Sequence, residues 1–271
     1  PRTEVHAILT RLDIEILEMT TESFKASVPP YRVDVTQEAD VVEEVLRIYG
    51  FNNIELSDTA HADYLAEFPA KDIDSYKRTI GELLVSTGFF EIWTNSLTNQ
   101  AYQEKHQLTF KGKAVEVLNK LSEEQGVLRQ TLLFTGLEVS AYNINRRQKD
   151  LRLFEFGKVY YKGMSGYQEE ERLALYITGN RETENWQHKT KPSTYFDLAQ
   201  TVSNILLKSG ITANQEIIKD QLLEYGSRLL LNQDEIGILG KVKSSLLKEF
   251  GIKQELFYAE LNTSLLFNAA N

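Results

Sequence analysis

The stretch VPPYRVD at residues 28–34 and the stretch EADVVEEVLRIYG at residues 38–50 decide how the first part of this chain folds. The two prolines in the first stretch end any strand before them, because proline cannot donate a hydrogen bond to a sheet. In the second stretch, apolar residues recur at helical spacing at Val41, Val45 and Ile48, and the final glycine favours a helix C-terminus. The pattern predicts a helix that begins near the first glutamate and ends one residue before that glycine.

Four carboxylates, those of Asp34, Asp40, Glu43 and Glu44, lie within eleven residues of this region. On a helix the last three share one face at spacings i, i+3 and i+4, and we expect the apolar residues on the opposite face. Like charges at these spacings repel by roughly a few tenths of a kcal/mol, which a hard divalent cation with oxygen ligands would remove. The spacing indicates a metal site that a partner's oxygens would complete. The alternative is a solvated acidic face in which Arg47 pairs with Glu43 or Glu44.

Composition places the chain among ordinary soluble globular proteins. Its 271 residues have room for one large domain or two smaller ones, and 42% of them are apolar and 25% charged. No run reaches the roughly 18 apolar residues of a membrane span, and the N-terminus lacks the pattern of a signal peptide. The absence of cysteine excludes disulfides and fits a reducing compartment. We expect a cytoplasmic protein without membrane contact and, because the chain begins at Pro1 rather than methionine, an excised fragment.

Charge is unevenly distributed along the chain. Residues 1–70 contain 14 acids and 5 bases, a net charge of −9, whereas the remaining 201 residues contain 25 of each. The N-terminal part would therefore repel phosphate backbones. This disfavours a general nucleic-acid-binding role for that part.

The sequence predicts two domains. Residues 1–55 are predicted to form a helix, a strand at 24–28 and the acidic helix, which together make a small unit of winged-helix type. Residues 56–70 are predicted to be a linker. The acidic domain with its linker therefore occupies residues 1–70. The second domain, residues 71–271, alternates helical and strand-like segments. Helices are predicted from Ile73 to Gly88 and over 129–146, 194–208 and 244–250, and strands over 89–93, 115–118, 151–161, 172–178, 235–242 and 256–261. Because several strands are joined by short turns, we expect an α+β fold with a mixed, mainly antiparallel sheet.

Most catalytic motifs are absent. The chain has no phosphate-binding glycine loop, no G-x-S-x-G and no H-E-x-x-H, and its four histidines are scattered singly. A small basic cluster follows the long helix predicted over 129–146. It consists of Arg146, Arg147, Lys149 and Arg152. The cluster is typical of cations that complement a helix C-terminus, and the functional alternative is a contact with an RNA or an acidic partner.

Several stretches resemble the β subunit of bacterial phenylalanyl-tRNA synthetase. Residues 1–12, PYRVD at 30–34, ADVVEE at 39–44 and RIYGFNNI at 47–54 resemble its small metal-associated domain. GFFEI at 88–92, VLN at 117–119, LR at 128–129, NINR at 143–146 and LFEFGKVY at 153–160 resemble its class II synthetase-like core. The resemblance spans nearly the whole chain in order, so it is specific.

The resemblance implies a function. In this family the β subunit pairs with a catalytic α subunit in a heterotetramer that attaches phenylalanine to its tRNA in an ATP-dependent reaction. Its core domain is a class II fold without catalytic residues that packs against the α subunit. A Mg²⁺ ion shared with the α subunit is bound by carboxylates that correspond to Asp34, Asp40, Glu43 and Glu44. The editing site and the C-terminal tRNA-binding module of the family lie outside residues 1–271.

The resemblance also implies that this chain alone is inactive. Class II catalytic domains hold the ATP α-phosphate with an arginine, whose planar fork suits an oxyanion. Here the corresponding residue is Tyr161, which has no positive charge. The glycine-rich G-x-G-x-x-R element of active class II domains is absent as well, since the nearest segment, residues 237–241, does not fit it. Residues 223–228 depart from the family's histidine- and proline-containing segment near the end of the core. We expect no ATP binding by this chain on its own.

Other functions remain open at this stage. The main alternative is a stand-alone nucleic-acid-binding module, which the winged-helix-like front end suggests and the net charge of −9 disfavours. A magnesium-dependent hydrolase built on the acidic cluster lacks an evident nucleophile or base. The favoured interpretation is a non-catalytic subunit fragment that docks a partner and shares a metal ion with it.

Overall fold

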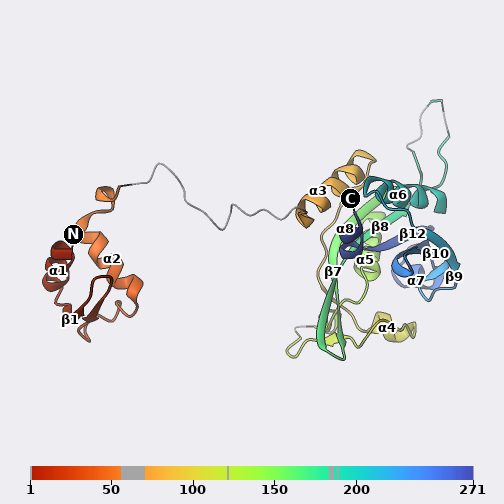
Figure 1. The fold of residues 1–271 in the computed structure, drawn as a ribbon. Coiled ribbons are helices and arrows are strands. Elements are labelled where there is room, and N and C mark those ends of the chain that lie inside the picture. The colour runs from red at the N-terminus through yellow and green to blue at the C-terminus, as the bar shows by residue number, and fades with distance from the viewer. Residues whose placement is uncertain (1, 56–70, 121, 183–185, 188, 271) are drawn as a thin grey trace. The chain divides into compact units, whose positions relative to one another are not determined.

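The computed structural model describes residues 2–55, 71–120, 122–182, 186–187 and 189–270. The chain divides into two units, residues 1–69 and 70–271 (Figure 1), which are called here the first unit and the second unit. The linker predicted over residues 56–70 lies outside the described residues, so the domain boundary at residue 70 stays a prediction. Within the described residues no helix is both long and apolar enough to cross a membrane.

The first unit is built from two helices and a hairpin. Its elements are α1 (Arg2–Arg11), β1 (Glu15–Met19), β2 (Phe24–Ser27), α2 (Glu38–Tyr49) and the short 3₁₀ helix η1 (Phe51–Asn53). Strands β1 and β2 pair antiparallel, and Ile8 and Leu9 of α1 are buried together with Ile14 and Val35. Helix α2 has the bounds that the sequence predicts. Strand β1 was not predicted, because most of its side chains are exposed and leave no clear alternation.

A seven-stranded sheet forms the centre of the second unit. In spatial order its strands are β3 (Phe90–Glu91), β7 (Leu151–Gly163), β8 (Gly166–Thr178), β12 (Leu256–Asn262), β11 (Asp234–Val242), β10 (Leu223–Leu231) and β9 (Asn214–Ile218). Only the pair β3–β7 is parallel, and all other neighbours are antiparallel. The predicted α+β fold with a mixed, mainly antiparallel sheet and flanking helices is confirmed.

Helices cover both faces of this sheet (Figure 1). The helices are α3 (Ile73–Ser86), α6 (Tyr195–Lys208) and α8 (Thr263–Ala269), whose buried residues belong to one core cluster, and α5 (Leu133–Asn145) and α7 (Ser244–Glu249), whose buried residues belong to another. Strand β8 shows why there are two clusters, since its side chains alternate between the faces. Leu173 and Leu175 join the first cluster, while Ala174 and Tyr176 join the second.

Smaller elements lie before the long helix α5. They are α4 (Ala101–Lys105), the 3₁₀ helix η3 (Glu123–Gln125) and a three-stranded sheet of β4 (Leu97–Thr98), β6 (Val127–Leu128) and β5 (Val115–Glu116). The helix predicted from residue 129 begins four residues later, at Leu133. The reason is that Arg129 is held by a buried ion pair with Glu155 before the helix starts. Strands β9 and β10 were missed because β9 is mostly exposed and β10 carries a glycine in its interior.

Candidate functional site

The acidic region begins with Asp40, which caps helix α2. The backbone N–H groups of Thr36 and Gln37 each donate to Asp40 Oδ2 at 2.8 Å, so the carboxylate satisfies donors that the helix itself leaves unpaired. These two hydrogen bonds favour the charged form and hold the pKa of Asp40 below its ordinary value of 3.8. Asp40 therefore positions the start of α2, and its other oxygen, Oδ1, accepts no hydrogen bond from a described residue.

This cap predicts a pH effect on the first unit. A carboxyl group whose pKa is lower in the folded state stabilises that state above its unfolded pKa and loses this contribution as the pH falls through the folded pKa. We expect Asp40→Asn to lower the midpoint of thermal unfolding of the first unit at pH 7. The difference from the parent chain should shrink as the pH falls below 3.8, the ordinary value for Asp40. A difference that is the same at pH 7 and pH 2 would contradict the charged cap.

Glu44 is buried, contrary to the expected exposed acidic face. Its Oε2 lies 3.0 Å from Arg32 and 2.5 Å from Arg47, and the two guanidinium groups lower the pKa of Glu44. Glu44 lies on the same side of α2 as the partly buried Val41 and Val45, because residues i, i+3 and i+4 share one face. The prediction that the apolar residues lie opposite Glu44 is therefore wrong, and the pairing of Glu44 with Arg47 is confirmed.

The other two candidate ligands are exposed. Asp34 lies 3.7 Å from Arg32, and Glu43 forms no ion pair with a described residue. Among the described residues, no group of three or more His, Cys, Asp or Glu side chains converges in a way that could hold a metal ion. An all-carboxylate donor set nevertheless suits Mg²⁺. The described residues therefore supply oxygen donors of the right kind, and they do not form a complete site by themselves.

Two members of the predicted basic cluster make contacts within the protein, and two are exposed. It comprises Arg146, Arg147, Lys149 and Arg152. Arg146 stacks on the ring of Tyr142, with 3.4 Å between the guanidinium carbon and the ring centroid. Arg152 donates to the backbone carbonyls of Thr87, at the end of α3, and of Arg181. Arg146 is exposed but is held against Tyr142, whereas Arg147 and Lys149 are exposed and their side chains make no ion pair or ring contact with a described residue, so these two are the members of the cluster available to a partner.

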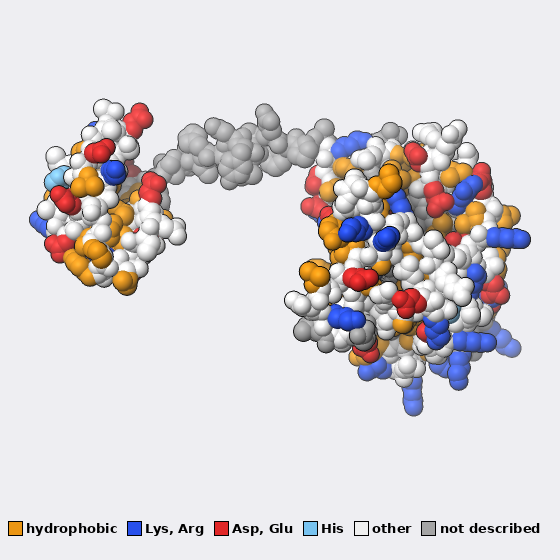
Figure 2. All heavy atoms as spheres, turned by 90° about the horizontal axis from the view of Figure 1, so that it is seen from below, with side chains coloured by type: hydrophobic (Ala, Val, Ile, Leu, Met, Phe, Trp, Pro, Cys, Tyr) orange, Lys and Arg blue, Asp and Glu red, His pale blue; other side chains and the backbone are white. Residues whose placement is uncertain are grey.

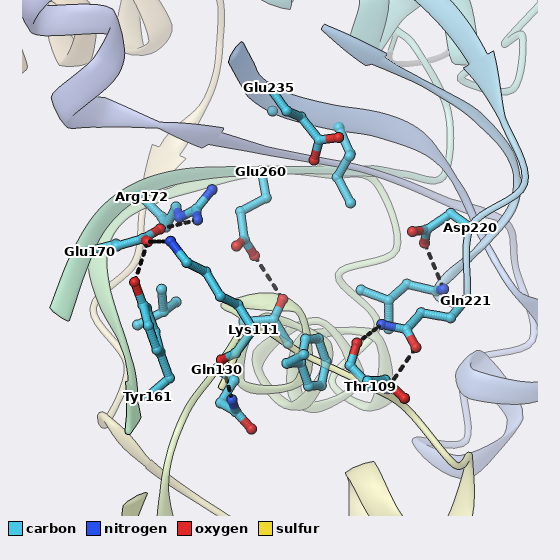
Figure 3. A pocket seen from close by; sticks show the side chains of 16 residues that line it. Thr109, Lys111, Gln130, Tyr161, Glu170, Arg172, Asp220, Gln221, Glu235 and Glu260 are labelled. Atoms are coloured by element: carbon cyan, nitrogen blue, oxygen red, sulfur yellow. Dashed lines mark hydrogen bonds and ion pairs between the residues drawn. The ribbon is translucent and has the colours of Figure 1, made fainter. Parts of the chain in front are cut away.

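The second unit contains a polar cavity of about 240 Å³, which is called here the polar cavity (Figure 3). Side chains from β7, β8, β11, β12 and the segments before β5, α5 and β10 line it. Tyr161 lies in its wall and donates to Glu170 at 2.9 Å, so the residue that the resemblance places at the missing arginine faces this cavity.

The cations of the polar cavity are neutralised from within. Lys111 Nζ lies 2.8 Å from Glu170, and Arg172 donates to the other oxygen of the same carboxylate. Burial favours the neutral acid, but the bonds from Lys111 and the charge of Arg172 outweigh it, so the pKa of Glu170 lies below its ordinary value. With Asp220, Glu235 and Glu260, the lining contains four carboxylates and two cations, a net charge of −2. Such a cavity repels a nucleotide's phosphates.

Comparison with known families identifies the chain. The profile described as "Phenylalanyl tRNA synthetase beta chain CLM domain" matches residues 66–263. The chain belongs to this family. A second profile, "tRNA synthetase B5 domain", matches residues 1–51, which contain the acidic helix. The resemblance inferred from the sequence is confirmed.

Curated relatives carry the name phenylalanine–tRNA ligase β subunit. The relative from Bacteroides thetaiotaomicron is 34% identical over 99% of this chain and 34% of its own length, and that from Chlorobium chlorochromatii is 37% identical over 96% and 33%. The chain therefore spans about a third of the length of these relatives. The crystal structure of pyrrolysyl-tRNA synthetase from Desulfitobacterium hafniense matches 97% of this chain and 85% of that one, with a TM-score of 0.57 at 14% identity. That likeness shows a class II synthetase fold.

Sequence reasoning missed most of the polar cavity. Lys111, Glu170, Arg172 and Glu260 come from separate segments, and no local spacing links them. Tyr161 was identified only through the family resemblance. The three consecutive acids of β8, Glu169 to Glu171, are the one local signal, because successive residues of a strand face opposite sides and both faces of the strand must therefore carry an acid.

Proposed function

We propose that this chain is the non-catalytic core of a phenylalanine–tRNA ligase β subunit, which docks a catalytic α subunit and contributes ligands to a Mg²⁺ ion shared with it. In that assembly the chain supports the ATP-dependent attachment of phenylalanine to its tRNA in the cytoplasm. The proposal extends the family membership to a partner, a metal and a reaction that belong to the whole ligase.

Exposed apolar side chains beside the candidate metal ligands carry this proposal. Tyr31 is 65% and Val33 80% exposed, and both lie within three residues of Asp34. Figure 2 shows hydrophobic and acidic side chains gathered on one face of the first unit. Isolated exposed apolar residues need no explanation, but apolar side chains interleaved with exposed carboxylates suit a surface that a partner covers.

Magnesium would add a strong bond to such an interface. Asp34, Asp40, Glu43 and Glu44 would supply carboxylate oxygens, and the bound ion would neutralise their mutual repulsion. Asp40 Oδ1 and Glu44 Oε1 accept no hydrogen bond from a described residue, so each of these carboxylates keeps an oxygen for the ion. The capping bonds of Asp40 and the two arginines on Glu44 would hold these side chains in place, as outer-shell partners do in metal sites.

The second unit exposes apolar side chains for docking, and the cations of its polar cavity are already paired. At the edge of the large sheet, Phe90 is 72% and Trp93 97% exposed, which suits docking. In the polar cavity the two cations are bound to Glu170, so neither is available to an ATP phosphate. We expect this chain alone to form no aminoacyl adenylate, and adenylate formation by the purified chain would contradict the proposal.

The metal bridge predicts a magnesium-dependent loss of association. We expect the chain to co-elute with a matched α subunit from a sizing column in Mg²⁺. Glu43→Ala/Glu44→Ala should weaken this association about tenfold more in Mg²⁺ than in a chelator, because only the metal-dependent part is lost. The measurement is the dissociation constant under both conditions.

A matched double variant serves as the control. Glu15→Ala/Glu18→Ala removes the same charge from exposed positions of β1, away from α2. It should leave both dissociation constants within about twofold of the parent chain. Equal weakening by Glu43→Ala/Glu44→Ala with and without Mg²⁺ would refute the metal bridge, and separate peaks under every condition would refute docking by this part of the subunit.

A further inference from the structure

Glu260 has an unusual position in the wall of the polar cavity. It is only 9% exposed, and its Oε2 accepts from Thr131 Oγ1 at 2.7 Å, from the backbone N–H of Leu132 at 3.0 Å, and from the hydroxyl of Tyr258. These bonds fix the carboxylate in place. The second oxygen, Oε1, accepts no hydrogen bond from a described residue, although the residue lines the cavity. A buried carboxylate thus presents one free oxygen to an open space.

Glu260 has no cation within the protein. The two cations of the polar cavity, Lys111 and Arg172, are both bound to Glu170 (Figure 3), and no described Lys, Arg or His pairs with Glu260. A buried charge is costly unless it is paired. The site therefore has an unmet requirement for a positive charge.

Two further carboxylates strengthen this requirement. Glu235 of β11 lines the same cavity, and its side chain forms no ion pair or hydrogen bond with a described residue. Asp220 uses Oδ1 to accept from the backbone N–H groups of Leu222 and Leu223. Figure 3 shows Glu235 and Glu260 on neighbouring strands at one side of the cavity. With Glu260 these two further residues place three carboxylates in the lining, and the two cations of the cavity are both bound to a fourth, Glu170.

We propose that the polar cavity binds a small organic cation, a molecule with one primary ammonium group that donates a charge-assisted hydrogen bond to Glu260 Oε1. An ammonium group suits the site better than a metal ion, because no group of three acids among the described residues converges as metal ligands do. The cavity of about 240 Å³ has room for a molecule of several carbon atoms, since water occupies about 30 Å³ in the liquid. This inference is independent of the metal bridge, which concerns the first unit.

Titration of the intact chain with n-butylammonium, followed by ligand-observed NMR at pH 7, tests this site. The uncharged n-butanol has the same carbon chain and is the matched ligand. We expect n-butylammonium to bind at least tenfold more tightly than n-butanol, because the charged hydrogen bond is the distinguishing contact. Equal affinities would overturn the proposal, as would tighter binding of n-butanoate, which has a carboxylate and no ammonium group and would assign recognition to Lys111 and Arg172.

Variants locate the bound cation. Glu260→Gln keeps the shape of the side chain and removes its charge, so it should weaken n-butylammonium binding about tenfold. Glu235→Gln changes an exposed position whose replacement leaves the core intact, and it should weaken binding about threefold even if the first variant fails to fold. Asp234→Asn removes the same charge from the adjacent residue outside the cavity lining and should change nothing. Unchanged affinity in both glutamine variants would overturn the site.

Discussion

Replacing Arg129 with methionine is expected to lower the free energy of unfolding of the second unit by about 3–5 kcal/mol. Arg129 is 3% exposed and its partner Glu155 1% exposed, with 3.0 Å between Nη1 and Oε1. The substitution would leave the Glu155 carboxylate buried without a counter-charge. Removing one member of a buried ion pair costs more than the pair contributes, because the remaining charge has no water to solvate it.

Hydrogen bonds and close packing hold both members of this ion pair in place. Arg129 also donates to Thr94 Oγ1 at 2.6 Å and to the Lys158 carbonyl at 2.9 Å, and Thr94 donates to Glu155 at 2.8 Å. The space for the guanidinium depends on Gly157, because a Cβ atom there would overlap Arg129. The network therefore joins the segment after β3, the segment before α5 and strand β7.

Chemical denaturation of three variants would measure this effect. Arg228→Met is the matched control, since Arg228 forms an exposed pair with Glu216 at 2.7 Å and its loss should cost less than about 1 kcal/mol. Adding Glu155→Gln to Arg129→Met should recover part of the lost stability, because the double variant leaves no buried charge. A cost for Arg129→Met as small as that for Arg228→Met would show that the buried pair contributes little.

Arg129 also shows what the sequence could predict about the fold. Helix α2 was predicted with its observed bounds because an apolar stripe, a proline stop before it and a glycine after it are all local signals. The start of α5 was predicted four residues early, because the ion pair that holds Arg129 outside the helix joins residues 26 positions apart. Such a pairing is a tertiary property that no local pattern contains.

The candidate site likewise has features that local spacing predicts and features that depend on tertiary contacts. The spacing of Asp40, Glu43 and Glu44 predicted that they lie on one helix, which is a local inference. Spacing alone did not show that Glu44 is buried against Arg32, since the loop between them decides that contact. The polar cavity was beyond sequence reasoning, because its lining comes from strands that pair only in the folded sheet. The proposed function therefore rests on the family resemblance, and the charge balance of the cavity followed from the structure.

Replacing Gly136 with alanine is the second change with a large expected effect. A Cβ atom at this position of α5 would overlap the ring of Tyr176. That ring is fully buried, and its hydroxyl donates to the Leu132 carbonyl at 2.6 Å, so it cannot move without breaking a buried hydrogen bond. We expect the second unit to lose about 1–3 kcal/mol of stability, which is the usual cost of overpacking a core.

Gly81 provides the matched control within the same unit. It also lies inside a helix, α3, but a Cβ atom there would meet Phe154 at 3.9 Å and Phe156 at 4.0 Å, which are ordinary contacts. Alanine is a better helix former than glycine by about 1 kcal/mol, so Gly81→Ala should stabilise the second unit. The same substitution should thus have opposite signs at the two positions, and denaturant unfolding measures both.

A double-variant cycle assigns the loss at Gly136 to the ring of Tyr176. In a Tyr176→Leu background the overlapping ring atoms are gone, so adding Gly136→Ala should cost little or should stabilise the helix by up to about 1 kcal/mol. If Gly136→Ala destabilises equally with and without the tyrosine ring, the clash is not the cause. The reversal of sign would show that α5 lies close to the sheet because a glycine faces Tyr176. The position of α5 matters for the polar cavity as well, because Thr131 and Leu132, which precede this helix, donate to Glu260 in the cavity wall.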